Sequence, residues 1–368
     1  MNNWACDLAV PGVRGLEPYR PGKPIEELER EYGVTNAIKL ASNENPLGPS
    51  PRALEAARRA LRVIHRYPDD NGFALKQALA RKLNVVPGNI TLGNGSNDIL
   101  ELLARAFVQP ENEVVFSEHA FAVYPIVTRA VGAKPVITKA KNWGHDLAAM
   151  RAAVNARTRL VFIANPNNPT GTWLAAGELE EFIRSMPAHV LVAVDEAYFE
   201  YVSEPDYPDT VTWVGKYPNL ITTRTFSKAY GLAGLRVGYA VSSPEMADVL
   251  NRVRQPFNVN SVALAAATAA LGDEMHVARA AQVNREGMQL LAGTFKSLGL
   301  NFIPSAGNFV CVDFGRPAAL VYEGLLRAGV IVRPVANYGM PNHLRITVGR
   351  PEENLRFITA LKQVMRDQ

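Results

Sequence analysis

Short apolar runs with almost no polar interruption divide the middle of the chain. A strand with one face in water alternates apolar and polar side chains, whereas a strand covered on both faces is apolar throughout. The second pattern applies to the runs at residues 114–116, 160–164, 190–194, 220–222 and 237–241. They predict a mainly parallel sheet that is sandwiched by helices.

Helical patterns lie between several of these runs. Apolar side chains are spaced to share one helix face at residues 99–107 and again at residues 179–186. Helices that alternate with buried strands are typical of α/β proteins. The fold class that we expect is therefore α/β, with a large domain built on the parallel sheet.

The pattern changes after about residue 244. Helices are predicted at 261–271, 273–298, 317–328 and 351–366, and strands at 308–314, 330–333 and 343–348. This interleaving predicts a second, smaller α/β domain. We expect an N-terminal arm that completes part of the small domain (residues 1–44), a large domain (45–250) and a small C-terminal domain (251–368).

The composition of the chain says more about where the protein is located in the cell than about its activity. The chain has 368 residues, of which 48% are hydrophobic and 20% charged, ordinary values for a globular protein. No run approaches the roughly 18 apolar residues of a membrane span, and residues 1–7 lack the parts of a secretory signal. Cys6 and Cys311 match no metal or redox pattern. We expect a cytoplasmic protein with no metal and no membrane partner.

The formal net charge is only +4, and the basic residues gather in one place. Arg58, Arg59, Arg62 and Arg66 are spaced for one side of a helix. A nucleic-acid surface is one interpretation, but no aromatic residues interleave with the arginines and no binding motif accompanies them. A solvated helix face is favoured, with no nucleic-acid partner.

Three polar motifs each follow directly after a predicted strand. They are NPNNPTG at residues 165–171, DEAY at 195–198 and TFSK at 225–228. In open α/β sheets, ligands bind in the crevice outside the carboxyl ends of the strands. The three motifs are therefore expected to converge on one binding site.

Lys228 is the most informative residue of these motifs. It lies in a loop of small residues, near the hydroxyl of Ser227 and the guanidinium of Arg236. That setting suits a lysine that forms a covalent imine while its neighbours hold a phosphate. Asp195 follows a long apolar run, where a carboxylate is costly unless it is paired.

In this order, the three motifs resemble those of the fold-type I aminotransferases that use pyridoxal 5′-phosphate (PLP). The resemblance extends from about residue 18 to the C-terminus and is closest to the histidinol-phosphate aminotransferases. Further stretches that carry it are EPY at 17–19, ASNENP at 41–46, RYPD at 66–69 and LRITVG at 344–349. It implies the fold-type I PLP-dependent transferase fold, with a large domain and a smaller α/β domain.

The resemblance also implies how the cofactor is held. Lys228 would bond to PLP and move a proton, and Asp195 would pair with the pyridinium nitrogen. Tyr198 and Asn168 match the partners of the cofactor's phenolate oxygen. Phe121 aligns with the aromatic that stacks on the ring, where many relatives have tyrosine; the change removes a hydroxyl and keeps the stacking face.

Phosphate binding is implied for the loop and helix start at Gly95, Ser96 and Asn97, where backbone amides favour an anion. Thr225, Ser227 and Arg236 join them by resemblance. Tyr67 resembles a tyrosine that reaches the same phosphate from a neighbouring subunit. The resemblance therefore implies a homodimer with shared active sites.

Substrate binding is implied for two arginines in strand-like runs, Arg333 and Arg345. Two guanidinium groups that converge suit a phosphate or a carboxylate. The resemblance assigns them, with Tyr19, to the terminal phosphate of histidinol phosphate, and Asn43 to a further active-site position. The expected reaction is transfer of an amino group between L-histidinol phosphate and 2-oxoglutarate, which gives imidazole acetol-phosphate and L-glutamate in histidine biosynthesis.

Other functions remain open from the sequence alone. An aromatic amino acid aminotransferase and a PLP-dependent decarboxylase of phosphothreonine type would share nearly all cofactor contacts. An NAD-dependent oxidoreductase is suggested by the start of a GxGxxG pattern at residue 93, but Asp98 replaces the third glycine. A regulator without turnover is disfavoured because the catalytic set is complete.

Overall fold

A seven-stranded sheet forms the centre of the larger part of the molecule. The computed structural model describes residues 4–19 and 22–367. The strand order is β2-β8-β7-β6-β5-β3-β4, and the neighbours from β7 to β4 run parallel, whereas β8 is antiparallel to β7 and to β2. The strands are β2 (Ile90–Gly93), β3 (Glu113–Ser117), β4 (Lys134–Thr138), β5 (Thr158–Ala164), β6 (Leu191–Asp195), β7 (Leu220–Thr225) and β8 (Gly238–Val241).

Helices cover both faces of this sheet, as the apolar runs predicted. In β5, Val161 and Ile163 belong to one buried cluster, and Leu160 and Phe162 to another on the opposite face. The first cluster includes residues from α4 (Pro51–Ala60), α5 (Phe73–Leu83), α8 (Leu147–Ala153), α9 (Ala176–Arg184) and α11 (Ser261–Leu271). The second includes residues from α6 (Ser96–Phe107), α7 (Val123–Ala130) and α10 (Pro244–Val253).

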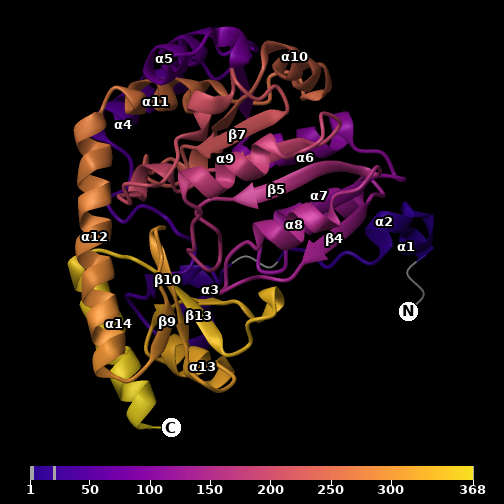
Figure 1. Cartoon of the computed structure of the whole chain (residues 1–368). Coiled ribbons are helices and arrows are strands. Elements are labelled where there is room, and N and C mark those ends of the chain that lie inside the picture. Colours follow the sequence, from indigo (N-terminus) through magenta and orange to yellow (C-terminus); the bar gives the residue numbers. More distant parts are fainter. Residues whose placement is uncertain (1–3, 20–21, 368) are drawn as a thin grey trace.

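A smaller unit lies below the large sheet in Figure 1. Its antiparallel sheet has the order β12-β13-β10-β9, and a short parallel pair joins β1 to β11. Its strands are β1 (Ile38–Lys39), β9 (Asn301–Ile303), β10 (Phe309–Asp313), β11 (Val330–Ile331), β12 (Arg333–Pro334) and β13 (His343–Thr347). Its helices are α3 (Ile25–Tyr32), α13 (Ala319–Arg327) and α14 (Pro351–Arg366).

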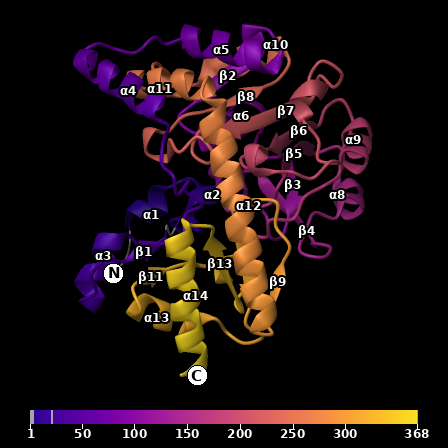
Figure 2. The same ribbon diagram turned by 90° about the vertical axis from the view of Figure 1, so that its left-hand side faces the viewer.

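Helix α12 (Glu274–Ser297) runs along both units (Figures 1 and 2). Its C-terminal residues Leu291 and Phe295 are part of the core of the small unit. By contrast, α11 packs against α4 and α5 in the large unit, although it lies beyond the expected boundary at residue 250. We propose that the small domain begins within α12, with α11 as part of the large domain.

Some elements differ from the sequence prediction. The arginine cluster does not lie on one helix, because α4 ends at Ala60 and a 3₁₀ turn (Leu61–Val63) carries Arg62; all four arginines are exposed. The run at 330–333 is two short strands, with Val332 between them. Strand β4 was not predicted, because Lys134 and Pro135 interrupt its apolar pattern. Among the described helices, none is long and apolar enough to cross a membrane.

Two short helices, α1 (Trp4–Leu8) and α2 (Pro11–Arg14), precede the small unit. The second packs beside α7 of the large unit. The side chains of Trp4 and Leu8 are exposed over most of their surface. Tyr19, which follows these helices in the chain, lines the cavity between the two units.

Candidate active site

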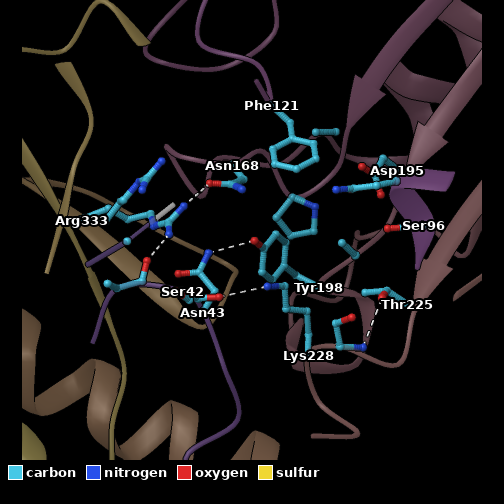
Figure 3. A pocket seen from close by; sticks show the side chains of 18 of the residues that line it. Ser42, Asn43, Ser96, Phe121, Asn168, Asp195, Tyr198, Thr225, Lys228 and Arg333 are labelled. Atoms are coloured by element: carbon cyan, nitrogen blue, oxygen red, sulfur yellow. Dashed lines mark hydrogen bonds between the residues drawn. The ribbon is translucent and has the colours of Figure 1, made fainter. Parts of the chain in front are cut away.

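A cavity of about 260 Å³ lies between the two units, at the carboxyl ends of β6 and β7. Side chains from both units point into it (Figure 3). Most of the residues expected at the site line this cavity: Tyr19, Asn43, Ser96, Asn97, Phe121, Asn168, Asp195, Tyr198, Thr225, Ser227, Lys228, Arg236, Arg333 and Arg345. Gly95 directly precedes the lining residues, and Tyr67 lies elsewhere.

Lys228 follows β7 in a tight bend that begins after Thr225. Its Nζ donates a hydrogen bond to the carbonyl of Ser42 at 3.2 Å and lies 5.8 Å from the ring centre of Tyr198. Burial, and next the nearby charge of Arg345, lowers the pKa of Lys228 to about 8. A sizeable fraction of this amine is therefore neutral near pH 8 and able to act as a nucleophile.

Asp195 ends β6 and is almost completely buried. Thr223 Oγ1 donates to Asp195 Oδ1 at 3.0 Å, and Tyr124 Oη donates to Oδ2 at 3.2 Å. Burial raises the pKa of this carboxyl to about 6, while the two hydroxyls oppose that change. A positively charged N–H group in the cavity would complete its pairing, and a protonated pyridine nitrogen fits this requirement.

An anion-binding cup forms where α6 begins. The N-cap residue Gly95 has φ of +83°, and a Cβ there would lie 2.3 Å from the guanidinium of Arg236. The hydroxyl of Ser227 accepts a hydrogen bond from Arg236 at 3.3 Å. In the described chain, no carboxylate lies within ion-pair distance of Arg236. A helix N-terminus, the hydroxyl of Ser227 and a guanidinium without a carboxylate partner fit a phosphate group.

Two hydrogen-bond donors face the cavity between Lys228 and the arginines. Tyr198 Oη accepts a hydrogen bond from Asn43 Nδ2 at 2.9 Å, so its own proton remains free to donate. Burial raises the pKa of Tyr198 to about 12 and keeps it protonated. Asn168 Oδ1 accepts from Arg345 at 2.5 Å, which leaves the Asn168 NH₂ group as a donor. An oxyanion such as the cofactor phenolate matches both donors.

Arg333 and Arg345 are cross-strand neighbours on β12 and β13, and both are almost fully buried. Arg345 Nη2 donates to the carbonyl of Ala41 at 2.6 Å, but its buried Nε has no partner. Arg333 lies over the ring of Tyr19, 5.5 Å from its centre. The ion pairs found among residues 4–19 and 22–367 include neither arginine. Two buried cations without a carboxylate partner need an anion from outside.

Two aromatic residues expected to contact the cofactor, Phe121 and Tyr67, differ in where they lie. Phe121 lines the cavity and meets the ring of Tyr124 edge-on, with 5.9 Å between the ring centres. Tyr67 is 81% exposed and stacks on Phe257, outside the cavity of its own chain. The structure also gives site contacts to three residues to which the sequence assigned no role: Ser42, Thr223 and Tyr124. Their roles depend on contacts between distant segments, for which no local pattern exists.

The residues described above fit PLP at each of its polar groups, and comparisons with known proteins agree. The family model of the class I and II aminotransferases matches residues 35–361, and the chain belongs to this family. Histidinol-phosphate aminotransferase 2 of Pseudomonas fluorescens strain Pf0-1 is 63% identical over 360 residues, which cover 97% of each chain.

Solved structures show the same fold. The crystal structure of histidinol-phosphate aminotransferase from Sinorhizobium meliloti, in complex with pyridoxal-5'-phosphate, matches with a TM-score of 0.90. It is 33% identical, and the match covers 97% of both chains. Aspartate aminotransferase from Thermus thermophilus with maleate matches with a TM-score of 0.83 at 26% identity, over 94% of this chain and 97% of the other. The chain therefore has the predicted fold-type I aminotransferase structure.

Proposed function

We propose that this enzyme transfers an amino group between L-histidinol phosphate and 2-oxoglutarate with PLP as its cofactor. The observation that carries the proposal is the pair of buried, unpaired arginines across the cavity from Lys228. A phosphate ester and a dicarboxylate both carry an anion at the end away from the reacting group. The arginine pair suits either anion in turn. The identity of 63% to a histidinol-phosphate aminotransferase supports this substrate.

The chain's own groups divide the chemistry among them. When bound, PLP supplies an aldehyde that takes up the amino group and a ring that withdraws electrons from the reacting carbon. Lys228 Nζ, once free, would accept the proton from the substrate carbon and pass it to the cofactor carbon. Asp195 would hold the ring nitrogen of the cofactor in its protonated form, and Tyr198 and Asn168 would donate to its phenolate oxygen. Arg333 and Arg345 hold the far end of the substrate in place.

A substrate panel tests the proposal. Purified enzyme with PLP is incubated with 2-oxoglutarate and, in turn, L-histidinol phosphate, phenylalanine, tyrosine or phosphothreonine. We expect glutamate to form with the highest kcat/KM from histidinol phosphate, because only this substrate joins an imidazole to a phosphate. A higher kcat/KM with an aromatic amino acid would contradict the assigned substrate. Release of carbon dioxide from phosphothreonine without glutamate would instead indicate a decarboxylase.

The active enzyme is also proposed to be a homodimer. Tyr67 lies in a stretch of sequence that carries a group of exposed apolar side chains, and such exposed apolar surface marks interaction sites. The group comprises Leu61, Val63, Ile64, Tyr67 and Phe73, which are 47–81% exposed. A second copy that covers this surface would remove these side chains from water and bring Tyr67 to the phosphate cup of its partner. A cytoplasmic location stays a prediction of the sequence.

Mixed dimers test the shared site. Lys228→Ala removes the amine that bonds to PLP, and Tyr67→Ala removes the proposed contact to the phosphate in the partner's site. Each pure variant is therefore expected to be weakly active at limiting PLP. Co-expressed with different tags and purified as a mixed dimer, the two chains form one intact site, so about half of the wild-type activity should return. For Tyr67→Ala alone, PLP affinity should fall about 10-fold or more, as for a lost bond to a charged group.

Two results would contradict this arrangement. One is a mixed dimer that stays as inactive as the pure variants, since Tyr67 would then act within its own chain. The other is a monomer in analytical ultracentrifugation of the active holoenzyme. Arg66→Ala is the matched control, because it changes an exposed neighbour of Tyr67.

A further inference from the structure

Tyr124 is a completely buried tyrosine that no part of the proposed reaction yet uses. It is the second residue of α7, and its hydroxyl donates to Asp195 Oδ2 at 3.2 Å. A phenol without a partner in such a place would be destabilising. The hydroxyl of Tyr124 has this one hydrogen-bond partner in the described chain. The hydroxyl of Tyr124 therefore acts on the Asp195 carboxylate, which faces the cavity.

The ring of Tyr124 has a second set of contacts. It stacks on Phe162 of β5, with the ring centres 4.6 Å apart and an angle of 6° between the planes. On another side it meets Phe121 edge-on, at 89°. Figure 3 shows Phe121 and Asp195 bordering the same cavity. One side chain therefore touches both the carboxylate expected at the cofactor nitrogen and the aromatic expected on the cofactor ring.

The hydroxyls around Asp195 favour its ionised form against the effect of burial, and they fix the direction of its carboxylate. Thr223 binds Oδ1 and Tyr124 binds Oδ2, so both oxygens are fixed while the carboxylate still lines the cavity. Both bonds stabilise the ionised form. The other titratable groups that face Asp195 are Lys228 and Tyr198, and Tyr198 is kept neutral by burial. Apart from the two hydroxyls, Lys228 and the backbone N–H of Ala197 favour the charge on Asp195.

We propose that Tyr124 is a positioning residue: its hydroxyl holds Asp195 ionised and aimed at the cofactor nitrogen, and its ring supports Phe121. The proposal rests on the proposed use of PLP. Tyr124 does not touch the reacting atoms and acts through Asp195. Its hydroxyl therefore sets how strongly the apoprotein binds PLP and how that binding depends on pH.

The expected pH dependence follows from the direction of each effect. As the pH falls through the pKa of Asp195, which burial raises to about 6, the carboxyl takes up a proton and loses its attraction for a pyridinium. Removal of the Tyr124 hydroxyl takes away a donor to the ionised form, so the pKa of Asp195 rises further. PLP binding by the variant should then weaken at a higher pH than in the wild type.

The test compares PLP binding by the apoproteins of the wild type and of Tyr124→Phe. Dissociation constants are measured by absorbance between about pH 5 and pH 9, a range that includes the expected titration of Asp195. We expect binding by the variant to be about 10-fold weaker near neutral pH, with its acid limb displaced upward by about one pH unit. Titration of PLP itself is common to both proteins, and Lys228, whose pKa the charge of Asp195 raises, responds in the variant only through Asp195.

Two further variants separate positioning from packing. Thr223→Val removes the other hydroxyl donor and should displace the acid limb in the same direction, and it carries the test if Tyr124→Phe fails to fold. Tyr217→Phe is the matched control, since the Tyr217 hydroxyl donates to a different carboxylate, Glu180, at 3.1 Å; its binding curve should match that of the wild type. Circular dichroism establishes that each variant is folded.

The outcomes are distinct. An unchanged dissociation constant in Tyr124→Phe, or uniformly weaker binding with the acid limb in its wild-type place, would overturn the positioning role. A wild-type apoprotein that does not bind PLP would contradict the proposed function itself. Tyr124→Leu adds a check on the ring: it should weaken PLP binding beyond Tyr124→Phe, because it also removes the aromatic contact with Phe121.

Discussion

Lys228→Ala is expected to abolish nearly all turnover, by about 10⁴-fold or more, while the fold remains intact. The variant loses both the amine that bonds to the cofactor and the base that moves the substrate proton. Glutamate formation from histidinol phosphate and 2-oxoglutarate measures the loss. The near-visible absorption band of the wild-type holoenzyme should also change, since PLP would be held without its covalent link.

The same variant has an expected effect on the stability of the apoprotein. The pKa of Lys228 is about 8 in the folded protein, against an ordinary value of 10.5. The unfolded chain therefore binds this proton more tightly, and the folded protein is destabilised below pH 8, an effect that is relieved as the pH rises toward 10.5. Lys228→Ala should raise the free energy of unfolding by about 1–3 kcal/mol at neutral pH, and by less as the pH increases.

Lys216→Ala is the control for both measurements, because Lys216 is an exposed lysine that pairs with Glu180. Its turnover should equal that of the wild type. Normal turnover in Lys228→Ala would refute the role assigned to this residue. A stability that falls in Lys228→Ala at neutral pH would show that the amine is not held in a destabilising environment.

The sequence correctly predicted the strands that are buried on both faces. It did not predict strand β4 or the end of helix α4, where the apolar pattern is weak or the spacing stays helical beyond the helix. The runs in β5, β6 and β7 are continuous because helices cover both faces of the sheet. Strand β4 lies at the edge of the sheet, where Lys134 is exposed and the apolar pattern is weak. The arginines at 58–66 have helical spacing, but the α-helix gives way to a 3₁₀ turn after Ala60.

The candidate site shows the same division. Lys228, Asp195 and Asn168 were predictable because each belongs to a motif at the end of a buried strand, and such ends meet at one edge of a sheet. Tyr124 has the sequence signature of an ordinary core aromatic on a helix. Only the packing of α7 against β5 and β6 brings its hydroxyl to Asp195. Likewise, the carbonyl of Ser42 that binds Lys228 comes from a segment distant in sequence.

Arg345→Ala should raise the KM of both histidinol phosphate and 2-oxoglutarate, by about 10- to 100-fold each. The guanidinium lies beside Arg333 on the small sheet, with its Nη groups on Asn168 and Ala41 and its Nε without a partner. An incoming anion would complete this set. Arg345→Lys keeps the charge without the planar fork, and its KM values should lie between those of the wild type and Arg345→Ala.

The loss of Arg345 has a second expected consequence, at Lys228. The positive charge of Arg345 is, after burial, the largest cause that lowers the pKa of that amine. Without it, the pKa of Lys228 should rise above about 8, and the pH at which apoprotein bonds covalently to PLP should rise with it. Arg350→Ala, which changes an exposed arginine that donates to the carbonyl of Pro46, should alter neither quantity. An unchanged KM for either substrate in Arg345→Ala would contradict the shared anion site, because one guanidinium that binds both anions cannot be removed without weakening both.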